Sequence, residues 1–448
     1  MAKGDGRRWV KQAVTRGATA IISDSPLASD PGVPVVVIPD MESRLGALAA
    51  SFWNHPSASL NLIAVTGTDG KTSTSQFIAR ALNALGHSCA NIGTLGIGWP
   101  GDQHLEGNAL TTPDAFTLQR ALAHLRDAGA RTVTIEASSH GLSQGRLDGA
   151  SVDAAVLTQL GRDHLDYHGS QEAYAAAKRR LFERQELRSA VLNADDPFSL
   201  ECQKCLRSST QQITYSLAGN HKAKIQGRLF HSSARGLFME VRYRGHTERL
   251  RTSIRGSFNA QNLMAALGAL LCMDIDFPAA AKALEGVSPV PGRMEIFTSP
   301  DKPLVALDYA HTPNGLEQVL RDFRQFVSGS LWCVIGLMGN RDRGKRPLMG
   351  AHLARWADCI ILTDSMTHGE DPNAIIGDLL RTIPPDKPVR VIHDREAAIA
   401  WALDRAKPED GVLVIGTGKG HERETIELNG RRIRADYACV SERLRLQG

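Results

Sequence analysis

The stretch Asn61-Leu-Ile-Ala-Val-Thr-Gly-Thr-Asp-Gly-Lys-Thr-Ser-Thr74 determines the fold predicted for this chain. Leu62 to Val65 is an apolar run of strand length, and the residues after it are small and turn-forming. A helical apolar stripe then begins at Lys71 and ends before Gly86. A strand, a glycine turn and a helix N-terminus bring several backbone N–H groups and the positive helix end to one point. That point suits a polyphosphate.

The turn is a shortened phosphate-binding loop, because Val65 stands where a full G-x-x-x-x-G-K-[ST] motif has its first glycine. The lysine can reach terminal phosphates, and the threonine hydroxyl after it can bind Mg²⁺. The alternative is a glycine-rich turn with a surface lysine. The residues predicted to bind a nucleotide here are Gly67, Thr68, Gly70, Lys71, Thr72 and Ser73.

Length and composition indicate two or three domains with a large core. The chain has 448 residues, of which 42% are hydrophobic and 22% charged, as is ordinary for a globular protein. A net charge of +4 without a block of Lys or Arg does not favour nucleic-acid binding. There is no signal peptide, and no apolar run approaches the ~20 residues needed to span a membrane. We therefore expect a monomeric cytoplasmic protein that binds small molecules.

The seven cysteines are scattered, and most lie in apolar segments, so we expect buried free thiols. Cys202 and Cys205 form a lone C-x-x-C without a second pair. Zinc or redox chemistry there is the less favoured alternative.

Strand and helix patterns divide the chain into three parts. Residues 1–58 carry a helix-like stretch and two short strands, too little for an independent core, as if the front of a small α/β domain were missing. Residues 59–292 alternate strand and helix, which favours a largely parallel sheet with helices on both faces. The stiff segment Pro289-Val-Pro-Gly292 marks a boundary. A second α/β pattern fills residues 293–448.

The predicted elements can be stated by residue range. In the first part they are a helix at Asp5–Val14 and strands at Ala18–Ile22 and Val35–Ile38. In the second they are strands at Leu62–Val65, Thr132–Ile135, Ala154–Leu157 and Ala190–Leu192, antiparallel hairpins within residues 210–255 (Leu237–Tyr243 among them), and a helix at Asn259–Cys272. In the third they are strands at Leu304–Leu307, Leu331–Ile335, Cys359–Leu362 and Val412–Ile415.

Polar side chains gather at the ends of these strands, where ligands bind in parallel sheets. Glu136 follows one strand and is a natural Mg²⁺ ligand beside a phosphate loop, although a solvated strand-end glutamate is an equal alternative. The segment Gly161–Gly169 is dense in Asp and His but lacks zinc spacing. Lys178 lies on a helix predicted over Gln171–Glu183, where a lysine is usually solvated.

Three loops in the last third follow predicted strands and carry groups that suit anions. They are Asp308–Pro313, Gly336–Pro347 with four cationic side chains, and Gly416–Glu422. Cations in a glycine-rich loop bind phosphate, and an arginine can hold a carboxylate through two parallel hydrogen bonds. Flexible solvated loops are the alternative interpretation.

In this order, the motifs resemble the Mur ligase family, and within it the MurE type, which adds the third amino acid to UDP-N-acetylmuramoyl-L-alanyl-D-glutamate. The resemblance covers nearly the whole chain. It rests on Thr66–Thr72, Thr111–Asp114, Glu136–Arg146, Arg162–Gly169, Tyr174–Lys178, Asn259–Asn262, Pro291–Glu295, Asp308–Pro313, Arg341–Pro347 and Gly418–Glu422.

The resemblance implies an α/β protein of three domains. Residues 1–58 would be a partial N-terminal domain of the type that binds the UDP-substrate, residues 59–292 the ATP-binding ligase domain with a P-loop-type parallel sheet, and residues 293–448 a Rossmann-like domain that binds the amino acid. It also implies an activity in peptidoglycan biosynthesis. ATP and Mg²⁺ would serve to join an amino acid to a carboxylate through an acyl phosphate, with release of ADP and phosphate.

The resemblance further implies a role for individual residues. Catalysis and metal binding would involve Lys71, Thr72, Glu136, His164 and Lys178, the last as a carbamate that turns a cation into a metal ligand. The nucleotide would also contact Asn259, Asn262, Arg293 and Asp308. The muramoyl dipeptide would contact Thr111, Thr112, Ser138, Gln144 and Arg146. The incoming amino acid would contact Arg341, His368 and Glu422.

Two features depart from the family. The uridine-binding front of the N-terminal domain is absent, so either the start was chosen late or the acceptor is not a UDP-sugar in the usual pose. Diaminopimelate-adding members carry Asp-Asn-Pro-Arg, whereas Met366 and His368 stand here at the Asn and Arg positions. Without the arginine, the chain lacks a side chain that can bind the distal carboxylate of diaminopimelate through two parallel hydrogen bonds. Glu422 still suits the distal amine of an incoming amino acid.

The sequence therefore disfavours diaminopimelate and leaves lysine, ornithine or an unusual amine open. Two alternatives to the muramoyl-dipeptide ligase also stay open. One is a MurE-like paralogue that uses the same chemistry on a non-UDP acceptor in a specialised pathway. The other is a remnant that binds nucleotide without catalysis.

Overall fold

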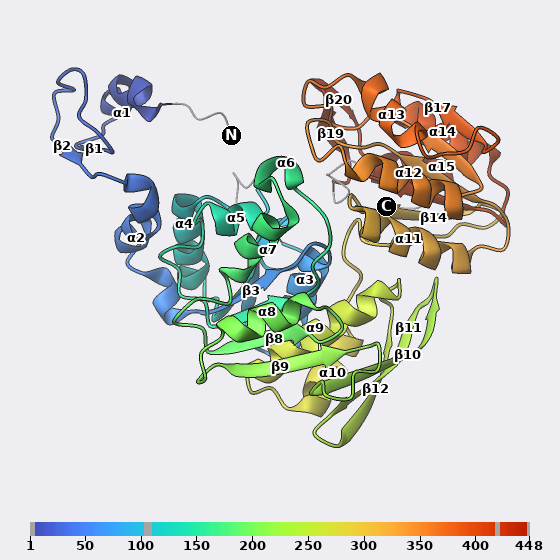
Figure 1. The fold of residues 1–448 in the computed structure, drawn as a ribbon, viewed down its shortest axis with the longest axis horizontal. Helices are drawn as coiled ribbons and strands as arrows, with labels where there is room; N and C mark the ends of the chain where they lie inside the picture. Colours follow the sequence, from blue (N-terminus) through green and yellow to red (C-terminus); the bar gives the residue numbers. More distant parts are fainter. Residues whose placement is uncertain (1–4, 103–109, 417–421, 446–448) are drawn as a thin grey trace.

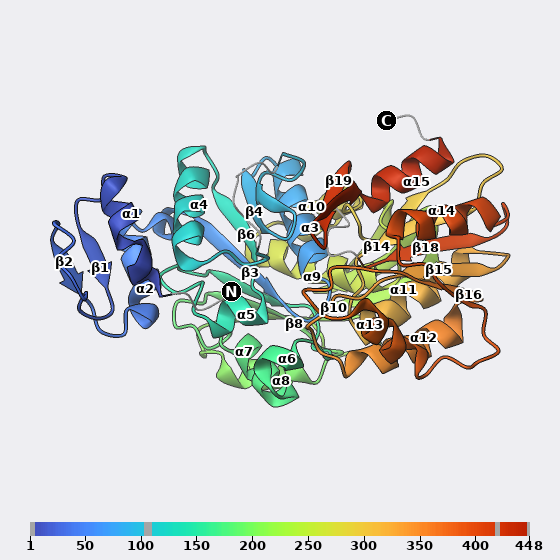
Figure 2. The same ribbon diagram turned by 90° about the horizontal axis from the view of Figure 1, so that it is seen from above.

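The computed structural model describes residues 5–102, 110–416 and 422–445. Its elements form three groups that follow one another in chain order along the molecule (Figures 1 and 2). The first group is small and N-terminal, the second is built on a ten-stranded sheet, and the third is built on a six-stranded sheet. Within the described residues, no helix is both long enough and apolar enough to cross a bilayer.

The N-terminal group contains a 3₁₀ turn (Gly6–Trp9), α1 (Val10–Thr15), the parallel pair β1 (Ile21–Ser23) and β2 (Val35–Val37), and α2 (Met41–Phe52). The helix predicted at Asp5–Val14 is thus a 3₁₀ turn followed by a short helix, and the first strand begins only at Ile21. The helix α2 was not predicted. It reaches the ten-stranded group through Gly46, where a Cβ would lie 2.1 Å from the backbone oxygen of Asp148.

The central sheet has the order β12-β11-β10-β9-β8-β7-β3-β6-β4-β5. Its strands are β3 (Asn61–Thr66), β4 (Cys89–Gly93), β5 (Gly96–Gly98), β6 (Thr132–Glu136), β7 (Ala154–Leu157), β8 (Ser189–Asn193), β9 (Gln211–Ser216), β10 (Ile225–Ser233), β11 (Gly236–Tyr243) and β12 (His246–Thr252). In this order the strands from β9 to β4 are parallel, so the prediction of a largely parallel sheet is confirmed. The prediction of hairpins throughout residues 210–255 is wrong for β9, which pairs in parallel with β8; β10 to β12 are antiparallel.

Helices cover both faces of this sheet. One face carries α3 (Lys71–Ala84), α9 (Phe258–Cys272) and α10 (Phe277–Glu285), and the other carries α4 (Ala115–Asp127), α5 (Ser139–Ser143), α7 (Gln171–Arg179) and α8 (Phe198–Cys205). The short α6 (Leu165–His168) precedes α7, which ends at Arg179 and not at Glu183 as predicted. Along β3, Ile63 and Val65 enter one core and Leu62 and Ala64 the other, because strand side chains alternate between faces.

The C-terminal sheet has the order β13-β14-β18-β15-β16-β17 and is parallel except for β13. Its strands are β13 (Glu295–Phe297), β14 (Leu304–Asp308), β15 (Leu331–Ile335), β16 (Cys359–Leu362), β17 (Val389–Val391) and β18 (Gly411–Ile415). One face of the sheet is covered by α11 (Pro313–Phe326), α12 (Lys345–Trp356) and α13 (Pro372–Leu380). The other face is covered by α14 (Arg395–Arg405) and α15 (Asp436–Leu444). A hairpin of β19 (Thr425–Leu428) and β20 (Arg431–Arg434) precedes α15. All four predicted strands are present.

The position of β3 in the central sheet identifies where a ligand can enter. The chain leaves β3 through α3 toward β4 on one side, returns to β6, and then crosses to β7 on the other side of β3. In open α/β sheets, such a reversal leaves a crevice at the carboxyl ends of the strands. All seven cysteines are free thiols, and Cys89, Cys202, Cys333 and Cys439 are buried, as expected for most of them.

Asp308 ends β14 and makes a buried turn that fixes the start of the C-terminal sheet. Its carboxylate accepts hydrogen bonds from the backbone N–H of Met294 at 2.7 Å and of Ala310 at 2.8 Å. Burial raises the pKa of Asp308 to about 6, and the nearby Arg293 opposes the shift. The folded protein therefore binds a proton at Asp308 at pH values where the unfolded chain has released it.

We predict a measurable pH dependence of stability from Asp308. A raised carboxyl pKa stabilises the fold relative to the unfolded chain below pH ~4, and this contribution is lost as pH rises through ~6, by about 3 kcal/mol at ~1.4 kcal/mol per pKa unit. The free energy of unfolding of wild type minus that of Asp308→Asn should fall by this amount between pH ~3 and pH ~7. Urea unfolding across the range measures it. A difference independent of pH would contradict the buried, proton-binding carboxyl.

Candidate active site

The loop between β3 and α3 packs so closely against two neighbouring segments that its contact positions must be glycine. Gly67 and Gly70 have φ values of +147° and +83°, in the region that favours glycine. A Cβ at Gly67 would lie 1.8 Å from Thr158 Oγ1, and a Cβ at Gly70 would lie 2.3 Å from Asn262 Oδ1. The loop therefore places its backbone at the start of α3 as a phosphate loop does.

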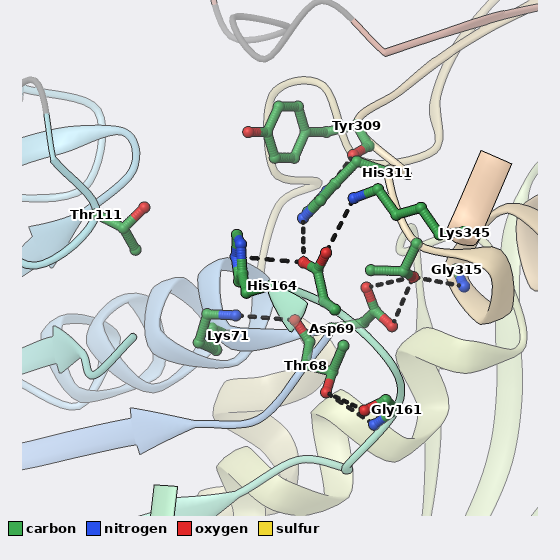
Figure 3. Close-up of polar contacts among 12 residues, drawn as sticks. Thr68, Asp69, Lys71, Thr111, Gly161, His164, Tyr309, His311, Gly315 and Lys345 are labelled. Atoms are coloured by element: carbon green, nitrogen blue, oxygen red, sulfur yellow. Dashed lines mark hydrogen bonds and ion pairs between the residues drawn. The ribbon is translucent and has the colours of Figure 1, made fainter. Parts of the chain in front are cut away.

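Two lysine amines converge on this loop. The Nζ atom of Lys71 donates to the carbonyl oxygens of Gly67 at 3.0 Å and Thr68 at 2.8 Å, and Figure 3 shows the second contact. The Nζ atom of Lys178 on α7 donates to the same Gly67 oxygen at 2.6 Å. The turn thus brings together two amines from two different helices at one point.

Lys178 is buried, with 1% of its surface exposed, so the expectation of a solvated helical lysine is wrong. Its amine lies 4.6 Å from the ring centroid of Tyr174, whose hydroxyl is 2.9 Å from Thr68 Oγ1. Burial lowers the pKa of Lys178 well below its usual value, and the charge of Lys71 lowers it further. The neutral amine is the nucleophilic form, and it is the form that combines with carbon dioxide to give a carbamate.

Glu136 lies at the end of β6 with 1% exposure, so the solvated alternative is wrong for this residue as well. Its carboxylate accepts from Thr72 Oγ1 at 2.9 Å, and from the N–H and hydroxyl of Thr94 at 2.8 and 3.1 Å. Each of these donors is neutral. A buried carboxylate beside a threonine hydroxyl and without a cation among its described hydrogen-bond partners is a fitting oxygen donor set for a hard divalent cation.

His164 follows the loop after β7 and precedes α6 in a left-handed conformation, with φ of +55°. Burial lowers its pKa to about 2, so the imidazole is neutral, as a metal ligand must be. Among the described residues, no group of three or more His, Cys, Asp and Glu side chains forms a metal site by itself. The predicted set of Thr72, Glu136, His164 and Lys178 contains only two such side chains, so it depends on the hydroxyl and the modified lysine.

The residues predicted to meet the nucleotide lie around the same loop. Asn262 faces Gly70, receives a bond from Thr74 Oγ1 at 3.4 Å and donates to Asn259 at 2.8 Å. Ser73 is buried in the first turn of α3. Arg293 stacks on the ring of Tyr309 at 4.5 Å and reaches Thr72 Oγ1 at 3.4 Å.

The five residues predicted to bind the acceptor form one connected network beside β6. Thr111 Oγ1 lies 3.3 Å from Thr94 Oγ1, and Thr112 Oγ1 bonds the backbone oxygen of Glu136 at 2.6 Å. Ser138 Oγ is 2.9 Å from Thr112 Oγ1. Arg146 donates to the Thr112 carbonyl at 2.7 Å and to Gln144 Oε1 at 2.7 and 3.0 Å.

The residues predicted to bind the amino acid lie on loops of the C-terminal sheet. Arg341 follows β15 and is partly buried. The pKa of His368 is lowered mainly by burial of the imidazole, and the positive charge of Arg341 lowers it further. His368 is exposed with φ of +48°, and its carbonyl accepts from Asn340 Nδ2 at 2.6 Å. Glu422 is partly buried, whereas residues 417–421 of its predicted loop lie outside the described residues.

Contacts between the two sheets join these groups, and no sequence motif predicts these contacts. Asp69 in the phosphate loop accepts from Thr312, at the start of α11, at 3.0 and 3.1 Å. Asp163 lies within 3.3 Å of His164, His311 and Lys345. The side chains of these three residues point toward one another in Figure 3. Both motifs were noted as polar, but only the fold reveals that they face each other.

The predicted residues thus assemble on two facing loop clusters: one at the carboxyl ends of β3, β6 and β7, the other at those of β14 and β15. The first cluster offers a phosphate loop, a buried carboxylate and two lysine amines. The second offers Arg341 and the polar groups around it. Such an arrangement can hold a polyphosphate and a second, anionic substrate on opposite sides of one space.

Most of the chain is similar to known proteins. Residues 65–270 match the Mur ligase middle domain, and residues 292–418 match the Mur ligase, glutamate ligase domain. The UDP-N-acetylmuramoyl-L-alanyl-D-glutamate–2,6-diaminopimelate ligases of Alkalilimnicola ehrlichii and Ectopseudomonas mendocina are 42% and 44% identical to this chain, over 95% and 93% of it and 86% and 85% of the relatives.

A solved structure of an enzyme with that same name aligns with a TM-score of 0.67 at 36% identity, covering 98% of this chain and 89% of the other. The MurF of Acinetobacter baumannii, at 18% identity, shares the fold with a TM-score of 0.70, covering 94% of this chain and 87% of that one. The predicted resemblance, the α/β fold class and the ligase type are therefore confirmed, and the chain belongs to the Mur ligase family.

Proposed function

We propose that this chain is an ATP- and Mg²⁺-dependent ligase that adds an amino acid to UDP-N-acetylmuramoyl-L-alanyl-D-glutamate in peptidoglycan biosynthesis. The observation that carries the proposal is the pair of amines, from Lys71 and Lys178, on the carbonyl of Gly67 beside the buried Glu136. The acceptor follows from the names of relatives that are more than 40% identical over nearly the whole chain. We further propose residues 1–58, 59–292 and 293–448 as its domains.

In this proposal the triphosphate lies along the phosphate loop at the N-terminus of α3, with Lys71 turning from the loop carbonyls to the terminal phosphates. Thr72, Glu136, His164 and the carbamate of Lys178 would hold the metal. Bound Mg²⁺ would neutralise the charge that spreads over the transferred phosphoryl group. The nucleotide's remaining contacts would come from Asn259, Asn262, Arg293 and Asp308.

The chemistry follows from the weakness of a carboxylate as an electrophile. Attack of the acceptor carboxylate oxygen on the γ-phosphorus releases ADP and gives an acyl phosphate, with Lys71 stabilising the charge. The amine of the incoming amino acid, held through its carboxylate by Arg341, then attacks the acyl carbon. Phosphate leaves, the amine loses its proton, and an amide remains. Water must be excluded, because it would hydrolyse the acyl phosphate.

The identity of the amino acid rests on the C-terminal loops. The relatives are named for diaminopimelate, which carries a second amine and a second carboxylate at its distal end. Here His368 is exposed and bound through its backbone, and Met366 contributes a thioether. Neither side chain offers the two-pronged grip of an arginine. We therefore propose a diamino acid whose distal amine meets Glu422, with lysine or ornithine preferred over diaminopimelate. A cytoplasmic location and a monomeric state remain predictions.

Catalysis should depend on both lysines. Lys71→Ala and Lys178→Ala should each lower the rate of ADP release on the order of 10²-fold or more. The first removes a cation that stabilises the transferred phosphoryl group, and the second removes a proposed ligand of the metal that does so. In the wild type, phosphate release should require acceptor and amino acid together. Lys282→Ala, which removes an exposed lysine from α10, is the matched control and should keep the wild-type rate.

Two results of this experiment would contradict the proposal. Full activity of Lys178→Ala without added bicarbonate or acetate would show that no carbamate is needed. ATP hydrolysis that proceeds equally without any acceptor would favour a nucleotide-binding remnant.

A screen of amino acids tests the predicted specificity. With UDP-N-acetylmuramoyl-L-alanyl-D-glutamate as acceptor, ADP release should be faster with lysine or ornithine than with diaminopimelate, because the grip on the distal carboxylate is lost. His368→Arg should shift the preference toward diaminopimelate. Preferential use of diaminopimelate by the wild type would overturn the interpretation of Met366 and His368. Activity only with simpler γ-glutamyl acceptors would instead indicate a paralogue with a non-UDP substrate.

A further inference from the structure

A buried ion pair joins the two halves of the candidate site. Asp163 Oδ1 accepts from Lys345 Nζ at 2.9 Å, and the two side chains are 3% and 9% exposed. The other carboxylate oxygen of Asp163 lies 3.3 Å from the Nε2 atoms of both His164 and His311. Asp163 belongs to the loop after β7, whereas Lys345 begins α12 and His311 follows β14.

The two loops also share a second, more exposed pair. Arg162, the residue before Asp163, donates to both oxygens of Asp342 at 3.2 Å, and 43% of its side chain is exposed. Consecutive residues of the β7 loop therefore contact two residues of the segment 341–345. Such a paired contact fixes the angle as well as the separation of the two loops.

Each residue of this ion pair lies close in sequence to a residue of the proposed active site. Asp163 directly precedes His164, which belongs to the proposed metal set. Lys345 lies four residues after Arg341, which is proposed to hold the amino acid's carboxylate. The ion pair thus connects the loop beside the transferred phosphoryl to the loop that presents the nucleophile.

We propose that Asp163 is a positioning residue for amide formation. Acting through Lys345 and His311, it holds the loop between β15 and α12 over the phosphate site, so that the amine meets the acyl phosphate. The inference rests on the proposed function and extends it, since it separates the two chemical steps. The phosphate loop, Thr72, Glu136 and Lys178 lie on the central sheet. Because His164 of the proposed metal set also contacts Asp163, the two steps are separated by changing Lys345, on the other side of the contact, and not by changing Asp163 alone.

Breaking the buried ion pair between Asp163 and Lys345 is costly. A buried carboxylate that loses its cation is left poorly compensated, so the loops separate or admit water rather than keep the same geometry. A displacement of about 1 Å between reacting groups can lower a rate on the order of 10²-fold. A general loss of stability, in contrast, would lower both chemical steps together.

The test measures the two steps separately. The variants are Lys345→Met, Asp163→Asn and their combination, with Arg355→Gln as control because Arg355 makes an exposed ion pair on the same helix α12. Aminolysis is followed by amide formation with the preferred amino acid. Activation is followed with hydroxylamine, a small nucleophile that needs no binding loop. Its nitrogen attacks the acyl carbon, phosphate leaves, and a hydroxamate forms.

We expect Lys345→Met to lower amide formation on the order of 10²-fold and to leave hydroxamate formation close to that of the wild type. The double variant should lose no more than the worse single variant, because both changes break the same contact. Arg355→Gln should keep both rates. Lys345→Arg, which keeps the charge but not its geometry, should show a smaller loss confined to amide formation, and it carries the test if Lys345→Met does not fold.

Unchanged amide formation in Lys345→Met, or equal losses in both assays, would overturn the positioning role. A wild-type chain that forms neither hydroxamate nor amide would overturn the proposed function itself. A wild type that forms both, with variants that match it, would overturn only the inference about Asp163.

Discussion

The site depends on how closely the backbone at Gly67 approaches its neighbours. With a Cβ at that position only 1.8 Å from Thr158 Oγ1, the loop between β3 and α3 can take this path only as glycine. The carbonyl of Gly67 is thereby turned toward Lys71 and Lys178, which both donate to it. One steric constraint thus sets the phosphate loop, brings in α7 and gathers two amines beside Glu136.

Buried charges in this protein differ in how they are compensated. Arg395 is fully buried yet paired with Asp436 at 2.8 and 2.9 Å, and Arg346 is paired with Glu370. Glu136, in contrast, receives its described hydrogen bonds from threonines. Since an uncompensated buried ion is costly, this difference is one reason why we propose Glu136 as a metal ligand.

Much of the scaffold could be predicted from sequence because its signals are local. The strand at β3, the helix start at Lys71 and the strands β15 and β16 follow from apolar runs with flanking turns. The burial of Lys178 could not be predicted, since it depends on a sheet that forms elsewhere in the chain. Nor could the contact between Asp163 and Lys345, which joins residues 182 positions apart. The helix α2 was missed because its apolar stripe is weak and includes Gly46.

The two proposed substrate sites lie on different sheets, and this separation has a consequence for selectivity. Thr112 and Arg146, proposed to bind the acceptor, belong to the central sheet, and Arg341, proposed to bind the amino acid, belongs to the C-terminal one. Changes in the amino-acid loops, such as His368, can therefore alter the nucleophile without disturbing activation of the acceptor. The same separation demands a rigid connection when the amide forms, because neither loop cluster alone fixes the distance between amine and acyl carbon. A buried ion pair meets that demand better than an apolar contact, since its geometry is directional and its loss is costly.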